Sequence, residues 1–174
     1  MQQLFSLIRD VQDYPKPGIV FKDFTPLLQD PRALALAVEL MVNPYRRSHV
    51  DVVVGAESRG FIFGTAIAQT LSAGFVPVRK PRKLPRQVHS VTYDLEYGTD
   101  TLEMHADALR ASDRVLVVDD LLATGGTLTA CTELVRKSHA QIVGISVLIE
   151  LVALRGRERL VGVGDVHSVL KYEG

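Results

Sequence analysis

One stretch of the chain, residues 114–127, constrains the fold more than any other. An apolar run, residues 115–118, ends in two carboxylates, Asp119 and Asp120, and a loop of small residues follows at 123–127. A continuous run of branched apolar residues is typical of a strand buried on both faces of a parallel sheet. Open sheets of this kind bind ligands at the carboxyl ends of their strands, so we expect the two acids to lie at a binding site.

The loop after the acids has the composition of an anion-binding turn. It consists of Ala123, Thr124, Gly125, Gly126 and Thr127. Glycines permit positive φ and close approach of the backbone to a ligand. Threonine hydroxyls and the first N–H groups of a following helix would then face a phosphate. An isolated glycine pair would usually be a plain turn, but the order of strand, acids and loop favours a sugar-phosphate site. The loop lacks the Gly-Lys-Ser/Thr ending of nucleotide hydrolases, which excludes that class.

Composition fits one domain, residues 1–174, in a reducing compartment. The 174 residues are 47% hydrophobic, enough for a sizeable core. Twenty basic residues balance 20 acidic ones, which gives no global attraction to nucleic acid or membrane. The single cysteine, Cys131, has no internal disulfide partner. We see neither a signal peptide nor an apolar run of membrane-spanning length, and we expect a cytoplasmic protein.

Further strand patterns alternate with helical ones along the chain. This alternation predicts an α/β fold, a doubly wound and mainly parallel sheet flanked by helices. Near the N-terminus, Leu4, Leu7, Ile8 and Val11 recur at helical spacing and predict a short helix. The other strand candidates are 51–55, 75–78, 141–150 and 166–170, and the helix candidates are 33–41, 62–71 and 128–135.

A second polar loop follows the strand candidate 51–55. It contains Glu57, Ser58 and Arg59, and the pattern after it is helical. A guanidinium offers a fork of donors suited to phosphate oxygens. The alternative is a structural ion pair between Arg59 and Glu57.

Residues 79–86 form the one dense basic segment. Five of these eight residues are lysine or arginine, including Arg79, Lys80 and Lys83. Binding to nucleic acid is the weaker interpretation, because prolines interrupt the segment and no aromatic residues are interleaved for base stacking.

Two other segments are ambiguous from pattern alone. Residues 19–28 carry Phe21 and Phe24 beside charges and prolines, which suits a flap or an edge segment equally well. β-forming residues on both sides of Gly98 predict a hairpin that could close over a site.

The stretch 115–127 resembles the phosphoribosyl pyrophosphate motif of type I phosphoribosyltransferases. The resemblance implies that Asp119 and Asp120 contact the ribose hydroxyls and that residues 123–127 hold the 5-phosphate. It also implies that residues 57–59 and the basic segment, through Arg79, Lys80 and Lys83, bind pyrophosphate.

Two segments narrow the resemblance to the adenine-specific members of that family. Residues 18–28 are similar to their N-terminal hood, which implies that Phe21 stacks on the purine while Val20 and Lys22 supply backbone contacts. The sequence Tyr-Asp-Leu-Glu-Tyr-Gly at 93–98 is similar to their flexible loop, which implies that Glu96 handles the purine's proton, with Tyr97 beside it. The expected layout is a hood and N-terminal helix at 1–30 and a core at 31–174 with a β-hairpin lid at about 80–104.

The implied reaction joins adenine to phosphoribosyl pyrophosphate and gives AMP and pyrophosphate. The residues expected to be catalytic are Glu96, Asp119, Asp120 and Arg59. The resemblance further implies Mg²⁺ held mainly by substrate, and a homodimer. Two alternatives stay open at this point: a phosphoribosyltransferase for another base, and a non-enzymatic sensor of phosphoribosyl pyrophosphate.

Overall fold

The computed structural model describes residues 1–94 and 98–173. They form two compact units, Met1–Leu40 and Met41–Gly174. That the whole chain is one domain stays a prediction. Among the described residues, every helix is too short or too polar to cross a lipid bilayer.

The first unit contains a small antiparallel ribbon and three helices. These elements are α1 (Gln2–Phe5), β1 (Arg9–Gln12), β2 (Val20–Asp23), α2 (Thr25–Gln29) and α3 (Pro31–Val42). The helix expected from Leu4 to Val11 is wrong beyond Phe5, because residues 9–12 pair with β2, where Val11 lies opposite Phe21. Cross-strand pairing here overrides the helical spacing. Phe24 is buried, whereas Phe21 is only partly covered and packs edge-on against Tyr14 with ring centroids 5.2 Å apart.

The start of α3 shows why the helix begins at Pro31. The Asp30 carboxylate accepts hydrogen bonds from the backbone N–H groups of Arg32 and Ala33, both at 2.9 Å. These amides would otherwise lack partners, and proline at the first helical position loses nothing by having no N–H.

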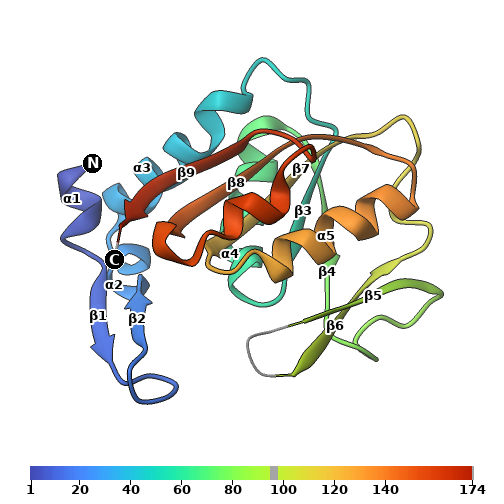
Figure 1. Cartoon of the computed structure of the whole chain (residues 1–174). Coiled ribbons are helices and arrows are strands. Elements are labelled where there is room, and N and C mark those ends of the chain that lie inside the picture. The colour runs from blue at the N-terminus through green and yellow to red at the C-terminus, as the bar shows by residue number, and fades with distance from the viewer. Residues whose placement is uncertain (95–97, 174) are drawn as a thin grey trace. The chain divides into compact units, whose positions relative to one another are not determined.

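The second unit is built on a five-stranded parallel sheet with the order β4-β3-β7-β8-β9 (Figure 1). The expected α/β sheet is confirmed. Its strands are β3 (Val52–Ala56), β4 (Gly74–Val78), β7 (Arg114–Leu122), β8 (Gln141–Leu151) and β9 (Val166–Tyr172). The other elements of this unit are η1 (Asn43–Tyr45), α4 (Arg59–Leu71), β5 (Val88–Asp94), β6 (Thr99–His105), α5 (Gly126–Lys137), η2 (Val152–Leu154) and η3 (Gly156–Leu160).

The direction of winding reverses between β3 and β7. The connection through α4 leads from β3 outward to β4, and the connection through α5 leads from β7 to β8 on the other side. Right-handed crossovers therefore put α4 and α5 on opposite faces of the sheet. Alternation along β7 agrees with this, because Val115 and Val117 join the buried cluster that contains Leu134 of α5. Ligands bind at such reversal points in doubly wound sheets.

The predicted hairpin is present as β5 paired antiparallel with β6. Its base is packed in the core, because Val91, Leu102 and Met104 are buried there and Lys137 Nζ donates to the Ser90 carbonyl at 2.7 Å.

Candidate functional site

A pocket opens at the carboxyl ends of β3 and β7, where the winding reverses. It encloses about 460 Å³ of empty volume, open to solvent. Two parts of the chain that are far apart in sequence line it: Arg59, and residues 119–121 with 123–128. The structure thus brings together the acids, the small-residue loop and one arginine from the preceding strand-loop-helix turn.

The two acids at the end of β7 are deeply buried. Asp119 is 7% exposed and Asp120 is 4% exposed. The Asp119 carboxylate accepts the backbone N–H of Asp120 at 2.9 Å. Burial, followed by the negative charge of Asp120, raises the pKa of Asp119 well above its usual value. Burial also raises the pKa of Asp120, against the opposing effect of the Arg59 charge.

Arg59 forms an ion pair with the second acid. Its Nε lies 3.1 Å from Asp120 Oδ2, and its side chain is 39% exposed. The guanidinium is thus held at the pocket while remaining open to solvent. Arg59 lines the pocket, whereas Glu57 accepts hydrogen bonds from Arg79 and Lys80.

Gly60 lets the first turn of α4 approach the acids. A Cβ on Gly60 would lie 2.9 Å from Asp119 Oδ1 and 3.3 Å from the Val118 carbonyl oxygen. A larger residue would therefore push the helix away from the acid pair. The peptide bond just before this turn, between Glu57 and Ser58, is cis.

The loop from Ala123 to Thr127 turns into α5 through a left-handed residue. Gly125 has φ +85°, a backbone conformation that residues with a side chain rarely adopt. α5 begins at Gly126, and the first N–H groups of a helix have no carbonyl partner within the helix. These N–H groups, with the positive end of the helix dipole, suit an anion.

Glu57 organises the start of the basic segment. Its carboxylate accepts from Arg79 Nε at 2.9 Å and from the Lys80 backbone N–H at 3.1 Å. Arg79 and Lys80 are both partly exposed, at 35% and 41% of their side chains. Lys83 is exposed on the same loop. Glu57 thus holds two residues of the neighbouring loop, and its expected contact with pyrophosphate stays a prediction.

The hairpin connects this basic segment to the loop 123–127. Lys80 pairs with Asp100 of β6, and Tyr93 Oη donates to the Asp100 carboxylate at 3.3 Å. Tyr93 Oη also lies 3.5 Å from Thr127 Oγ1. Burial raises the pKa of Tyr93. Sequence reasoning missed Tyr93, although its position in the hairpin alternation, two residues from buried Val91, was a usable signal.

The five residues expected to contact the purine do not line this pocket as described. Val20, Phe21 and Lys22 lie on β2 of the first unit, and Lys22 Nζ pairs with Asp10 at 2.7 Å. Glu96 and Tyr97 lie outside the described residues. The purine-binding roles of these residues stay predictions.

Metal ligands are sparse in the part of the chain that the structure describes. There, no three His, Cys, Asp or Glu side chains gather as a metal site would require. The pocket offers the two carboxylates of Asp119 and Asp120. Such a pair suits a cation that takes most of its oxygen ligands from substrate and water.

Comparison with known proteins gives consistent results. The family model of the phosphoribosyl transferase domain matches residues 25–165. A curated adenine phosphoribosyltransferase from Rhodopirellula baltica is 58% identical over 96% of this chain and 81% of its own length. The crystal structure of an adenine phosphoribosyltransferase from Rhodothermus marinus is 51% identical, with a TM-score of 0.94 over 98% of this chain and 97% of its own. The Saccharomyces cerevisiae enzyme, solved with adenine and an imino-altritol bisphosphate, is 36% identical, with a TM-score of 0.91 over 97% of each chain.

Proposed function

The chain belongs to the phosphoribosyl transferase family, and we propose that it joins adenine to phosphoribosyl pyrophosphate at the carboxyl ends of β3 and β7. It makes AMP and releases pyrophosphate. The observation that carries this site assignment is the single pocket wall formed by Arg59, the acid pair and the loop 123–127.

The sugar phosphate is assigned to the wall formed by β7 and α5. The 5-phosphate accepts hydrogen bonds from the backbone N–H groups and threonine hydroxyls of residues 123–127, where the helix dipole favours negative charge. The ribose hydroxyls donate to Asp119 and Asp120. This arrangement fixes the anomeric carbon above the pocket, and orientation of this kind lowers the barrier by removing unproductive poses.

Displacement at the anomeric carbon requires the management of charge. The bond between that carbon and the pyrophosphate oxygen breaks while a bond to the adenine nitrogen forms, and the sugar gains oxocarbenium-like positive charge. The buried carboxylates Asp119 and Asp120 favour that charge. Arg59, Arg79, Lys80 and Lys83 stabilise the departing pyrophosphate, as preorganised donors do for developing anions.

We assign adenine binding to the hood residues and removal of the adenine proton to the lid. Phe21 stacks on adenine, which is favourable by about 1–3 kcal/mol for bases on aromatic rings. The backbone of Val20 and Lys22 contacts the polar edge of the purine. Glu96, with Tyr97 beside it, takes the proton that the attacking nitrogen loses.

Mg²⁺ is proposed as the cofactor. Oxygens of ribose and pyrophosphate would hold it, with Asp119 and Asp120 as the nearest protein carboxylates. When bound, it neutralises charge on the leaving pyrophosphate. We further propose a cytoplasmic homodimer.

A base-specificity assay tests this function. Purified protein with phosphoribosyl pyrophosphate and Mg²⁺ is given adenine, hypoxanthine, guanine, xanthine or orotate, and pyrophosphate release is measured. Release with adenine well above all other bases is expected. Preference for another base, or no release with any, would contradict the proposal.

A further inference from the structure

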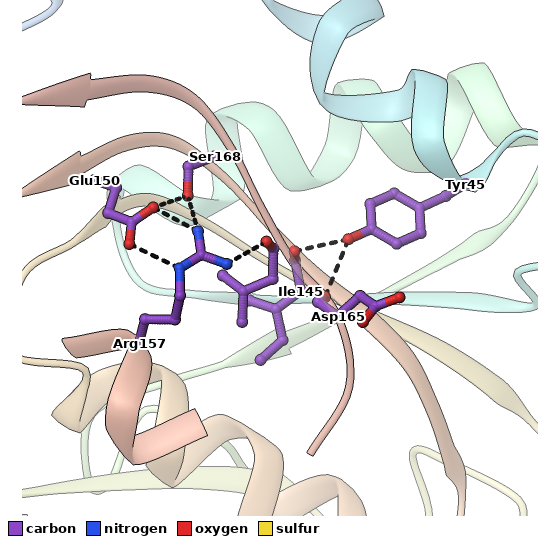
Figure 2. Close-up of polar contacts among 7 residues, drawn as sticks. Tyr45, Ile145, Glu150, Arg157, Asp165 and Ser168 are labelled. Atoms are coloured by element: carbon purple, nitrogen blue, oxygen red, sulfur yellow. Dashed lines mark hydrogen bonds and ion pairs between the residues drawn. The ribbon is translucent and has the colours of Figure 1, made fainter. Parts of the chain in front are cut away.

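Figure 2 shows a cluster of polar side chains around Arg157. Arg157 follows Gly156, whose backbone contacts the loop 123–127, which we call the phosphate loop. We call Glu150 of β8, Arg157 of η3 and Ser168 of β9 the Arg157 cluster. Arg157 Nε donates to Glu150 Oε1 at 2.9 Å, and Arg157 Nη2 donates to Glu150 Oε2 at 2.5 Å. This is a two-point contact, which fixes direction as well as distance.

The remaining donors and acceptors of the cluster are also used. Arg157 Nη1 donates to the Val166 carbonyl at 2.6 Å, and Nη2 contacts Ser168 Oγ at 3.0 Å. Ser168 Oγ donates to Glu150 Oε2 at 2.5 Å. The Glu150 side chain is only 6% exposed. A buried charge with this many partners holds its neighbours in one arrangement, and losing a partner is costly.

The residue before Arg157 touches the phosphate loop through its backbone. A Cβ on Gly156 would collide with the Ala123 carbonyl oxygen and lie 2.8 Å from the Gly125 nitrogen. In return, a Cβ on Gly125 would lie 2.6 Å from the Gly156 carbonyl oxygen. The two glycines therefore pack backbone to backbone, and the position of η3 sets the position of the loop.

We propose that Arg157 is a positioning residue for the site that binds the 5-phosphate. The Arg157 cluster fixes η3 against β8 and β9, and Gly156 transmits that position to residues 123–125. The cluster itself does not line the pocket, whose described walls come from residue 59 and residues 119–128. Its effect on substrate is thus indirect. The proposal rests on the assignment of the 5-phosphate to this loop.

A purely structural role would behave differently. The turn has a second anchor, because Leu160 of η3 is buried in the main apolar cluster. That anchor keeps η3 folded when the ion pair is lost, but apolar contact is non-directional and leaves the turn free to shift. A positioning role therefore changes affinity for the sugar phosphate, whereas a structural role changes thermal stability alone.

The test compares Glu150→Gln with Glu158→Gln. Glu158 lies in the same turn, but its pair with Arg155 is exposed, with side chains 74% and 62% accessible for Arg155 and Glu158. Such surface pairs contribute little. Calorimetry measures the Kd of each protein for AMP and phosphoribosyl pyrophosphate, and kinetics give kcat and the KM of each substrate.

For Glu150→Gln we expect the Kd and KM for the sugar phosphates to rise about ten-fold or more, as misplacing a supporting contact commonly does. The KM for adenine should stay within about two-fold of the wild-type value, because the lost contacts bind the phosphate of the sugar and therefore affect the KM of the sugar phosphate alone. Affinities matching those of Glu158→Gln would overturn the proposal, whatever the change in melting temperature.

Two further variants keep the outcome clear. Arg157→Lys keeps the positive charge but loses the two-point contact of the guanidinium with Glu150. Its affinity for the sugar phosphates should therefore resemble that of Glu150→Gln rather than that of wild type. Ser168→Ala removes one hydrogen bond and serves if the other variants fail to fold, with a smaller weakening in the same direction. If wild type makes no AMP from adenine, the proposed function fails, and the binding measurements still decide the role of the cluster.

Gly156→Ala tests the transmitting contact. Gly74→Ala is the matched control, because its added Cβ would meet nothing closer than the Asp51 carbonyl oxygen at 3.7 Å. Weaker AMP binding in Gly156→Ala and wild-type binding in Gly74→Ala are expected. Equal binding in both would contradict the coupling between η3 and the loop.

Discussion

Arg59 Nε lies 3.1 Å from Asp120 Oδ2, which joins the first residue of α4 to the acid pair near the carboxyl end of β7. The contact spans the point where the sheet reverses its direction of winding. It places the Arg59 cation directly beside the acid pair. Under the proposed assignment, the two members of this ion pair would contact the pyrophosphate and the ribose of the same substrate.

Replacing Arg59 with glutamine should lower kcat/KM for phosphoribosyl pyrophosphate roughly 10²–10³-fold, the usual effect of removing a donor to a developing anion. The substitution also leaves the buried Asp120 carboxylate without the positive charge of Arg59. Arg47→Gln, a change at an exposed residue of the same unit, is the control and should keep wild-type rates. Steady-state kinetics with varied phosphoribosyl pyrophosphate measure the difference. Equal loss in both variants would refute the assignment.

The double variant Asp119→Asn with Asp120→Asn should lose turnover by roughly 10²-fold or more, because the ribose is no longer oriented. The fold should remain, since removing two buried charges relieves burial cost rather than adding to it. AMP formation and circular dichroism measure the two effects. Asp107→Asn, at an exposed pair with Arg86, is the control. Wild-type kinetics in the double variant would overturn the sugar assignment.

Changing Glu96 to glutamine should lower turnover about 10²–10⁴-fold while leaving binding of phosphoribosyl pyrophosphate nearly intact, as expected for loss of a general base. Single-turnover AMP formation separates chemistry from binding. Glu133→Gln on the exposed side of α5 is the control. Unchanged turnover would remove Glu96 from proton transfer.

Acid should weaken the fold partly through Glu150. Hydrogen bonds from Arg157 lower the pKa of Glu150 below its ordinary 4.5. A carboxyl with a lowered folded pKa contributes stability that is present above the unfolded value and is lost as pH falls through the folded value. Urea unfolding from pH 7 to below pH 4 should therefore show a steeper loss for wild type than for Glu150→Gln. Parallel curves would show that the pair contributes no such pH dependence.

The central strand, the acids and the loop could be predicted from sequence because local pattern and tertiary role agree there. Residues 115–118 are buried on both faces of β7, and the two acids follow directly, although both acids are also buried and the strand continues to Leu122. The start of α3 is local in the same way, because Asp30 accepts hydrogen bonds from the N–H groups of the two residues at positions 32 and 33. These features depend on neighbours in sequence.

Other features depend on contacts between distant residues and could not be read in advance. Val11 continues the helical spacing of the apolar residues before it, but residues 9–12 form a strand because they pair with β2. Gly60 and Gly156 each look like ordinary small residues until the close backbone packing against Asp119 and Ala123 is seen. Tyr93 gains its role only where the hairpin meets Thr127.

The most direct measurement is a crystal structure of the protein grown with saturating AMP. The phosphate should accept hydrogen bonds from the backbone of residues 124–127, with the ribose hydroxyls on Asp119 and Asp120 and the adenine ring against Phe21. A phosphate bound at another surface, or a ribose turned away from the two acids, would contradict the assignment of the pocket.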